Sequence, residues 1–263
     1  MRLNVAIIIS LLSSISFADP SFTSITDSDF NEIAKEMSAN FTHSSMMGAS
    51  KLGTVFGFQV GVVGAQTSSP KTNEIVKRNA GSELPNLYNA GLIGAVGIPF
   101  GISFEAVLLP KLGSSGADFS SSSYALKVNV NDWIPVLPVN LALRGVYSNA
   151  KLSFPQVISG ANATVENKTS VTGIQLLISP MMPIFEPYFG IGSLSGSNEL
   201  AVSGTTGTVF DGSYSSAQSE KKSVSSTQIL VGAELSLALF KFGAEYSQAF
   251  GTNRMGIKIG MGF

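Results

Sequence analysis

Residues 253–263, NRMGIKIGMGF, end the chain and pose the question of its fold. The odd-numbered positions of this stretch from 255 onward carry Met, Ile, Ile, Met and Phe, and the positions between them carry glycine and one lysine. A period of two indicates a β-strand, because successive side chains of a strand point to opposite faces. A half-buried strand of a soluble protein has the same period. The alternation alone therefore does not decide what the apolar face contacts.

The composition narrows the choice. The chain has 263 residues, of which 44% are hydrophobic and 13% are charged, whereas soluble domains carry about 25% charged residues. This indicates a membrane protein or an unusually apolar secreted one. Cysteine is absent from the sequence, which argues against a disulfide-stabilised scaffold. The net charge of -1 provides no basis for a nucleic-acid partner, which normally requires a basic patch.

The N-terminus predicts export. Met1 and Arg2 precede the apolar run VAIIISLLSSIS at residues 5–16, and Ser16 and Ala18 are small residues at the positions that a signal peptidase requires. We predict a signal peptide over residues 1–18, cleaved after Ala18. An uncleaved anchor is the alternative, but its apolar run is shorter than the about 20 residues that a spanning helix needs. Because no later stretch is long enough either, a closed β-barrel is the remaining way for this chain to cross a membrane.

One segment of the mature chain has a helical pattern. Residues 26–41, TDSDFNEIAKEMSANF, place Phe30, Ile33 and Met37 at helical spacing. We expect the signal peptide to be followed by a periplasmic N-terminal segment with this short helix over residues 19–53 and by an outer-membrane β-barrel over residues 54–263. In a barrel, the helix would rest at the periplasmic mouth or plug the lumen.

From residue 54 the period changes to two, and about ten strands can be traced, within a range of 8 to 12. Short connections near residues 98, 133, 181 and 239 alternate with polar ones near residues 75, 114, 160, 210 and 251. Residues 67–86 and 155–166 are interpreted as loops, and residues 199–223 as a loop or an extended hairpin. Even strand numbers and alternating short and long connections are typical of bacterial outer-membrane barrels.

The fold predicted is all-β: a transmembrane antiparallel up-and-down β-barrel with a short N-terminal helix, in the outer membrane of a Gram-negative bacterium and surrounded by its lipid. A soluble sandwich or lipocalin-like barrel is the alternative. Its polar faces would meet water, and the polar faces here carry few charges. Trp133 lies in a tight connection, where it is either an interfacial anchor or a buried side chain.

Charged residues on the predicted inward faces are the candidate functional residues. They are Glu105, Lys127, Arg144, Glu234, Glu245 and Lys258. Their signs balance, and unpaired charges in a narrow lumen are costly, so we expect ion pairs. Barrels of about eight strands are filled by side chains, whereas aqueous channels appear near sixteen. Ten strands are closer to the filled class.

Catalytic and metal sites are not predicted. The single histidine, His43, stands beside Ser44 and Ser45 before the first strand, and we interpret it as a turn or capping residue. A nucleophile with its base, as hydrolases require, is not identified. The ligand spacings of zinc and calcium sites are likewise missing from the sequence. We expect no enzyme activity and no cofactor.

Several segments resemble an uncharacterised family of bacterial outer-membrane proteins. These are LGTVFGFQVGVV at 52–63, ALKVNVNDWIPVLPVNLALRGVYSNAKL at 125–152, GIQLLISPMMPIFEPYFGIGSLSG at 173–196 and the last strand. The resemblance implies an outer-membrane barrel without a known substrate or catalytic residue. The last strand also resembles the C-terminal signal recognised by the barrel-assembly machinery, through Ile257, Ile259, Met261 and Phe263.

Two functions remain open. The barrel is a small pore or a transporter of small or hydrophobic compounds, which the sequence favours slightly, or it is a non-conducting platform that presents extracellular loops for adhesion or binding. A continuous water path past the six inward charges would favour the pore. A lumen closed by ion pairs would favour the platform.

Overall fold

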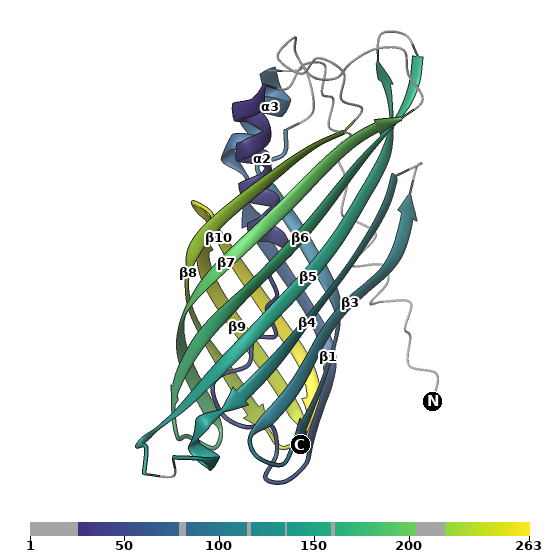
Figure 1. Ribbon diagram of the computed structural model, residues 1–263. Helices are drawn as coiled ribbons and strands as arrows, with labels where there is room; N and C mark the ends of the chain where they lie inside the picture. Colours follow the sequence, from purple (N-terminus) through teal and green to yellow (C-terminus); the bar gives the residue numbers. More distant parts are fainter. Residues whose placement is uncertain (1–25, 79–82, 115–116, 135, 159–160, 204–218) are drawn as a thin grey trace, which may run out of the picture.

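The computed structural model describes residues 26–78, 83–114, 117–134, 136–158, 161–203 and 219–263. These described residues form ten antiparallel strands that close into a barrel, in which neighbours in sequence pair and the first strand pairs with the last (Figure 1). The strands are β1 (Gly57–Ser68), β2 (Asn86–Ile98), β3 (Ile102–Ser114), β4 (Ala117–Asn129), β5 (Val139–Ile158), β6 (Ala161–Pro180), β7 (Phe185–Ser203), β8 (Ser219–Leu237), β9 (Phe240–Ala249) and β10 (Thr252–Gly262). The predicted up-and-down barrel of about ten strands is confirmed.

Two α-helices and one short 3-10 helix accompany the strands. They are α2 (Asp27–Phe41), α3 (Pro70–Arg78) and η1 (Val130–Asp132). The first is the predicted N-terminal helix, and Thr26 caps it in a reciprocal pair of hydrogen bonds with Asp29. Within the described residues, none of the helices has the length and apolar character needed to span a bilayer.

The seam between β1 and β10 closes the barrel. Gln59 pairs with Gly262 at one end of the seam, and Thr67 pairs with Arg254 near the other. At the C-terminus, Phe58 and Phe263 exchange two backbone hydrogen bonds of 3.0 Å each. The last residue of the chain is therefore part of the closure.

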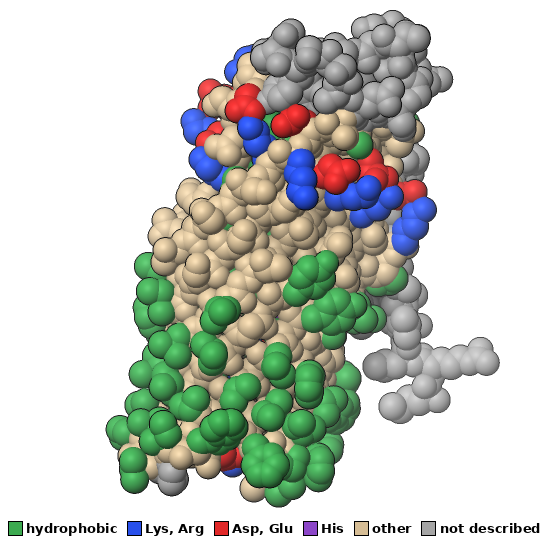
Figure 2. All heavy atoms as spheres, viewed as in Figure 1, with side chains coloured by type: hydrophobic (Ala, Val, Ile, Leu, Met, Phe, Trp, Pro, Cys, Tyr) green, Lys and Arg blue, Asp and Glu red, His purple; other side chains and the backbone are tan. Residues whose placement is uncertain are grey.

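The outer face of the wall is apolar on every strand. One large side chain from each strand, between 38% and 59% exposed, illustrates this: Phe58, Leu92, Phe104, Leu126, Leu143, Ile174, Ile191, Val231, Phe242 and Ile259. Figure 2 shows that hydrophobic side chains gather toward one end of the barrel and charged side chains toward the other. An exposed apolar belt of this extent is unfavourable in water and suits a hydrocarbon environment.

The apolar end carries the short connections and the C-terminus (Figure 1). Trp133 follows η1 in one of these connections and is 67% exposed. Its indole N–H donates to the carbonyl of Phe100 at 3.2 Å. The alternative of a buried tryptophan is therefore wrong.

The strands continue beyond the apolar belt, and several predicted loops are in fact strand. Residues 155–166 belong largely to the β5–β6 hairpin, and both ends of the 199–223 stretch extend β7 and β8. The centre of that stretch, residues 204–218, lies outside the described residues. Among the side chains that the structure describes, the outer face of these extensions carries mostly polar residues, such as Thr164, Glu166, Glu199 and Lys221, so it lacks the apolar alternation by which a strand is recognised.

The predicted loop at residues 67–86 contains helix α3. This nine-residue helix has only two large apolar side chains, Ile75 and Val76, and both are buried. They pack with Phe30 and Ile33 of α2. A short polar helix is stabilised mainly by such tertiary packing, which explains why its own sequence does not reveal it.

The two helices close the polar end of the barrel. There the described part of β8 from Ser219 to Gln228 pairs with β7 alone, whereas β8 pairs with β9 only from Ile229 onward. The wall is therefore taller over β5–β8. The helices α2 and α3 lie at the same end of the barrel, beside the shorter strands (Figure 1). Glu36 of α2 accepts hydrogen bonds from the backbone N–H groups of Lys71 and Thr72 in α3. Burial raises the pKa of Glu36 in spite of these bonds.

Candidate functional site

The N-terminal part of the chain runs inside the barrel. Helix α2 lies near the polar end, and residues 42–53, here called the lumenal segment, lead from it to the start of β1 at the apolar end (Figure 1). Residues 42–49 are all buried. The helix of the segment expected over residues 19–53 was predicted either to rest at the mouth of the barrel or to plug the lumen, and from Phe30 to Ala49 the described chain is largely buried inside the wall.

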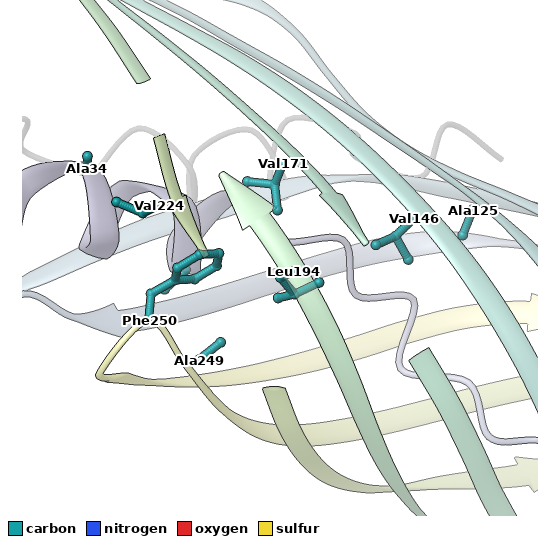
Figure 3. Close-up of a cluster of buried hydrophobic side chains, with 9 residues drawn as sticks. Ala34, Ala125, Val146, Val171, Leu194, Val224, Ala249 and Phe250 are labelled. Carbon is teal, nitrogen blue, oxygen red and sulfur yellow. The ribbon is translucent and has the colours of Figure 1, made fainter. Parts of the chain in front are cut away.

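Apolar contacts hold α2 in this position. Figure 3 shows the cluster in which Ala34 of α2 lies near Val224 of β8 and Phe250 of the β9–β10 turn. Leu194 and Val171 extend the cluster along the inner wall. The small apolar face of the helix thus packs against the inner wall. The lumenal segment, which follows the helix, therefore begins inside the barrel.

All six charged residues predicted to face the lumen do point inward. Glu105, Lys127, Arg144 and Lys258 are at most 2% exposed, and Glu234 and Glu245 are 8% and 6% exposed. The structure brings them into two groups, one around Glu105 and one around Glu245 and Glu234. Each group also contains a side chain of the lumenal segment, which is His43 in the first group and Ser44 in the second.

Glu105 is the centre of the first group. His43 Nε2 lies 3.2 Å from Glu105 Oε2, and Arg144 Nη1 and Lys127 Nζ lie 3.7 and 3.9 Å from the same carboxylate. The other ring nitrogen of His43 is 2.9 Å from Ser123 Oγ. His43, interpreted from the sequence as a turn or capping residue, therefore joins the lumenal segment to β3 and β4.

The second group surrounds Glu245 on β9. Ser44 of the lumenal segment donates to Glu245 Oε1 at 2.6 Å, and the Tyr188 hydroxyl donates to Oε2 at 3.0 Å. Close by in the barrel, Lys258 forms an ion pair with Glu234. Both oxygens of the buried Glu245 carboxylate are thus hydrogen-bonded, as a buried charge requires.

The backbone of the lumenal segment is bonded by wall side chains. Lys127 Nζ donates to the carbonyls of Gly48 and Ser50 at 2.9 and 3.0 Å, and Asn129 donates to the carbonyl of Ala49 at 2.7 Å. On the opposite side, Glu186 Oε1 accepts from the Ser50 N–H at 2.8 Å. An extended buried segment has no intrinsic partners for these groups, so the wall supplies them.

The fit between segment and wall is close at Gly48. A Cβ atom at this position would lie 2.3 Å from Glu186 Oε1. A side chain at this position would force the Glu186 carboxylate to move away from the backbone that it passes on its way to Ser50. The lumen is occupied by close packing here, in addition to the ion pairs.

Two charged residues on the inner face of the wall were missed in the sequence. Glu186 stands at the start of β7, where glycines weaken the alternation, and Arg254 was assigned to a turn. Arg254 in fact lies on β10, is 7% exposed, and shares the inward face with Lys258 four residues later. Extending the period-two pattern by four residues would have found it. Arg254 Nε has no hydrogen-bond partner among the described residues.

Arg254 lines a small internal cavity together with Ser44 and Ser123. Its volume is about 10 Å³, which is about the minimum for one water molecule. Its lining combines these polar side chains with apolar ones such as Met46, Val63 and Val107.

Ser123, His43 and Glu105 are arranged as a hydroxyl, an imidazole and a carboxylate, the order that activates a nucleophile in hydrolases. The side chains of His43 and Glu105 are fully buried, however, and the adjacent cavity has room for little more than a water. Among the described residues, the structure contains no group of three or more side chains suited to hold a metal ion. The cluster therefore joins segment to wall, and its geometry offers no place for a substrate.

Three residues of the proposed assembly signal lie on the outside of β10, and the fourth, Phe263, follows the strand directly. Ile257, Ile259, Met261 and Phe263 are between 48% and 64% exposed. The Phe263 ring contacts the ring of Phe58 edge-on, with 5.6 Å between the centroids.

The Glu105 cluster yields a stability prediction. Glu105→Gln removes the negative charge that Arg144 and Lys127 share, so the barrel should lose about 3–5 kcal/mol of its free energy of unfolding. Urea titration of the refolded protein in detergent, followed by heat-modifiable migration, measures this. Glu166→Gln is the matched control, because Glu166 also pairs with two lysines, Lys151 and Lys168, but on the exposed outer face. Equal effects of the two variants would contradict the buried role of Glu105.

Solved structures with a similar barrel come from several bacteria. The attachment invasion locus protein Ail of Yersinia pestis, in complex with the heparin analogue sucrose octasulfate, has 11% identity and a TM-score of 0.37, with 79% of this chain and 97% of Ail covered. The translocator domain of autotransporter NalP from Neisseria meningitidis has 11% identity and a TM-score of 0.46, with 80% and 88% covered. The Ralstonia pickettii toluene transporter TbuX has 10% identity and a TM-score of 0.30, with 80% and 89% covered. These TM-scores are too low to transfer a function to this chain.

Sequence comparison gives a different kind of result. No curated protein matches the chain. The sequence pattern of one protein family, however, matches residues 2–261, which is nearly the whole length. The chain therefore belongs to the family of unknown function DUF6588.

Proposed function

We propose that this protein is a closed β-barrel of the Gram-negative outer membrane that conducts no solute and acts as a platform. Its apolar belt would span the membrane, and the polar part of the wall, together with α3, would stand outside the membrane as a binding or adhesion surface. The observation that carries this proposal is the lumenal segment, which is buried and bonded to the wall on several sides.

The lumen contacts favour the platform over the pore. The six inward charges predicted from the sequence contact one another, the lumenal segment or other wall side chains, as in the Glu105 and Glu245 groups. Conduction would require these contacts to separate. A hydrophobic cargo would in addition have to pass polar and charged side chains such as Arg144 and Lys127, which would be desolvated without compensation. The transporter, slightly favoured by the sequence, is therefore the second candidate.

The outer face supports the membrane location. Apolar side chains alternate with inward polar ones on each strand, which is the pattern of transmembrane barrels. In such a membrane the barrel-assembly machinery would be a partner, and the exposed alternate residues of β10 up to Phe263 would be its signal. The Ser123–His43–Glu105 cluster has a structural role in this proposal, and no catalytic activity is included.

The membrane location is tested by an arginine on the belt. Leu176→Arg places a charge on an outward position of β6 that is 45% exposed. We expect about 2–4 kcal/mol of destabilisation if the position is near the bilayer midplane, seen as loss of folded barrel in a heat-modifiability assay on lipid vesicles. Ser170→Arg is the control, since it lies on the same strand and face but beyond the belt. Normal assembly of both variants would refute the proposed belt.

The closed lumen is tested by single-channel recording in a planar bilayer. The folded wild-type protein should produce no conductance steps, because the lumenal segment and the paired charges fill the lumen. A deletion of residues 27–50 leaves all ten strands intact and should conduct, which shows that the assay detects an open lumen. Discrete steps from the wild type that change in Arg144→Gln would show that the lumen conducts, and would favour the pore.

The orientation is tested by cysteine labelling, for which the cysteine-free chain is a clean background. Ser28 is exposed in the first turn of α2, at the polar end, and Val136 is 85% exposed in a short connection at the apolar end. With a membrane-impermeant maleimide on intact cells, Ser28→Cys should be labelled, and Val136→Cys only after the outer membrane is disrupted. The reverse pattern would place the polar end in the periplasm.

A further inference from the structure

A groove of about 770 Å³ lies on the outer wall, between the apolar belt and the polar end. Part of its floor is Gly145 on β5, where an added Cβ would meet no atom within 4 Å. On either side, Gly145 pairs with Leu126 of β4 and with Ile174 of β6. The missing side chain between two large ones creates the depression.

The lining changes from apolar to polar along the strands. Leu126 and Ile174 are 45% and 59% exposed and belong to the belt. One step along the same outer face, toward the polar end, the register aligns Tyr124 with Tyr147, and Tyr147 with Thr172. This places two aromatic rings and then hydroxyl groups above the apolar floor. Tyrosines in this position mark the edge of the hydrocarbon region in membrane barrels.

A row of charged side chains crosses the same face farther toward the polar end. The register aligns Lys151 with Lys168, then Glu199, then Lys221. Glu166 lies next to this row and pairs with Lys151 and Lys168 at 2.5 and 2.8 Å. Three lysines against two glutamates leave a charge of +1. Figure 2 shows charged side chains gathered beyond the apolar part of this view.

The spacing of these rows is set by the strand. Lys151 is four residues from Tyr147 on the same face of β5, and at 3.3 Å per residue this is about 13 Å along the strand. The ammonium groups can reach part of this way back, because lysine side chains are long and flexible. A ligand that touches both rows must therefore be an amphiphile with a large anionic headgroup.

We propose that this groove binds a phosphorylated glycolipid of the outer leaflet. An acyl chain would lie along Gly145 between Leu126 and Ile174, the sugar rings would stack on Tyr124 and Tyr147, and phosphate would accept hydrogen bonds from the lysine row. This inference rests on the proposed membrane location and adds a ligand class to it.

The graded lining favours this occupant over an ordinary phospholipid. A phospholipid phosphate is attached close to its acyl chains, so it would stay near the tyrosine row and leave the 13 Å to the lysines unbridged. A phosphorylated oligosaccharide spans that distance and has hydroxyl groups to pair with Thr172 and its neighbours. One carboxylate, Glu166, shared by two lysines also leaves part of their hydrogen-bonding capacity for phosphate.

The proposal is tested on the folded full-length chain in detergent micelles, with binding measured by native mass spectrometry. The probe is an acylated disaccharide that carries two phosphates, compared with its dephosphorylated form and with phosphatidylglycerol. Gly145→Leu adds a side chain to the floor of the groove, at a position where a Cβ meets no atom within 4 Å, and should weaken binding of the phosphorylated probe about tenfold or more. Gly94→Leu is the matched control, because Gly94 also has no atom within 4 Å of a Cβ and does not line this groove.

A double variant, Lys151→Gln with Lys168→Gln, tests the charge. It should weaken binding of the phosphorylated probe and leave binding of the dephosphorylated probe unchanged. Equal binding to the Gly145→Leu and Gly94→Leu variants would overturn the groove as the site. Phosphatidylglycerol bound as tightly as the glycolipid would overturn the ligand class. Either failure, in a protein that passes the heat-modifiability check, leaves the arginine, conductance and labelling results for the proposed function intact.

Discussion

A carboxylate enclosed in the barrel, Glu105, sets the condition that the rest of the interior meets. A buried charge is tolerated only when neighbouring groups replace the water it has lost. Two cationic side chains of the wall, Arg144 and Lys127, approach it, and His43 from the N-terminal part of the chain provides the closest contact at 3.2 Å. The interior is therefore complete only when wall and lumenal segment are both present.

The same reasoning explains why wall and segment fit one another so closely. Lys127 serves both sides, since it lies beside Glu105 and also donates to the carbonyls of Gly48 and Ser50. Removal of the segment would take from Lys127 both of its carbonyl acceptors and from Glu186 its hydrogen bonds with Ser50, and would leave them only Glu105 and Ser179 of the wall. In a wide aqueous pore, water would compensate such groups. In this narrow lumen the chain itself does so, and this favours a closed barrel.

The sequence predicts the strands of the barrel wall better than it predicts the helices and the segment that the wall encloses. Period-two alternation in stretches such as 253–263 reports which face of a strand is apolar, because lipid or core contact imposes that pattern on each strand separately. It also placed Lys127 and Arg144 on the inner face. The polar extensions at 155–166 have no such constraint and read as loops. Helix α3 and the route of residues 42–53 depend on contacts with residues far away in sequence, which a local pattern does not record.

The candidate site divides in the same way. The identity of the inward charges follows from parity along a strand, and Arg254 was recoverable by extending that parity. Their pairing was not, since His43 and Glu105 are brought together across 62 residues of chain. The groove at Gly145 likewise depends on Leu126 and Ile174 of neighbouring strands, and a single glycine in a strand indicates only that a side chain is absent.

The seam between β1 and β10 also constrains the order of events during assembly. Gln59 and Gly262 pair although nearly the whole barrel sequence lies between them. Among the strand pairings of the wall, this contact therefore has the largest entropic cost of loop closure, and we expect it to form late. The lumenal segment leads into β1 through residues 54–56 and lies inside the completed ring. Inserting it after closure would mean threading a chain end through a packed interior. The segment must therefore already lie in the concave face of the open sheet when the two edge strands meet, so the barrel folds around its own N-terminus.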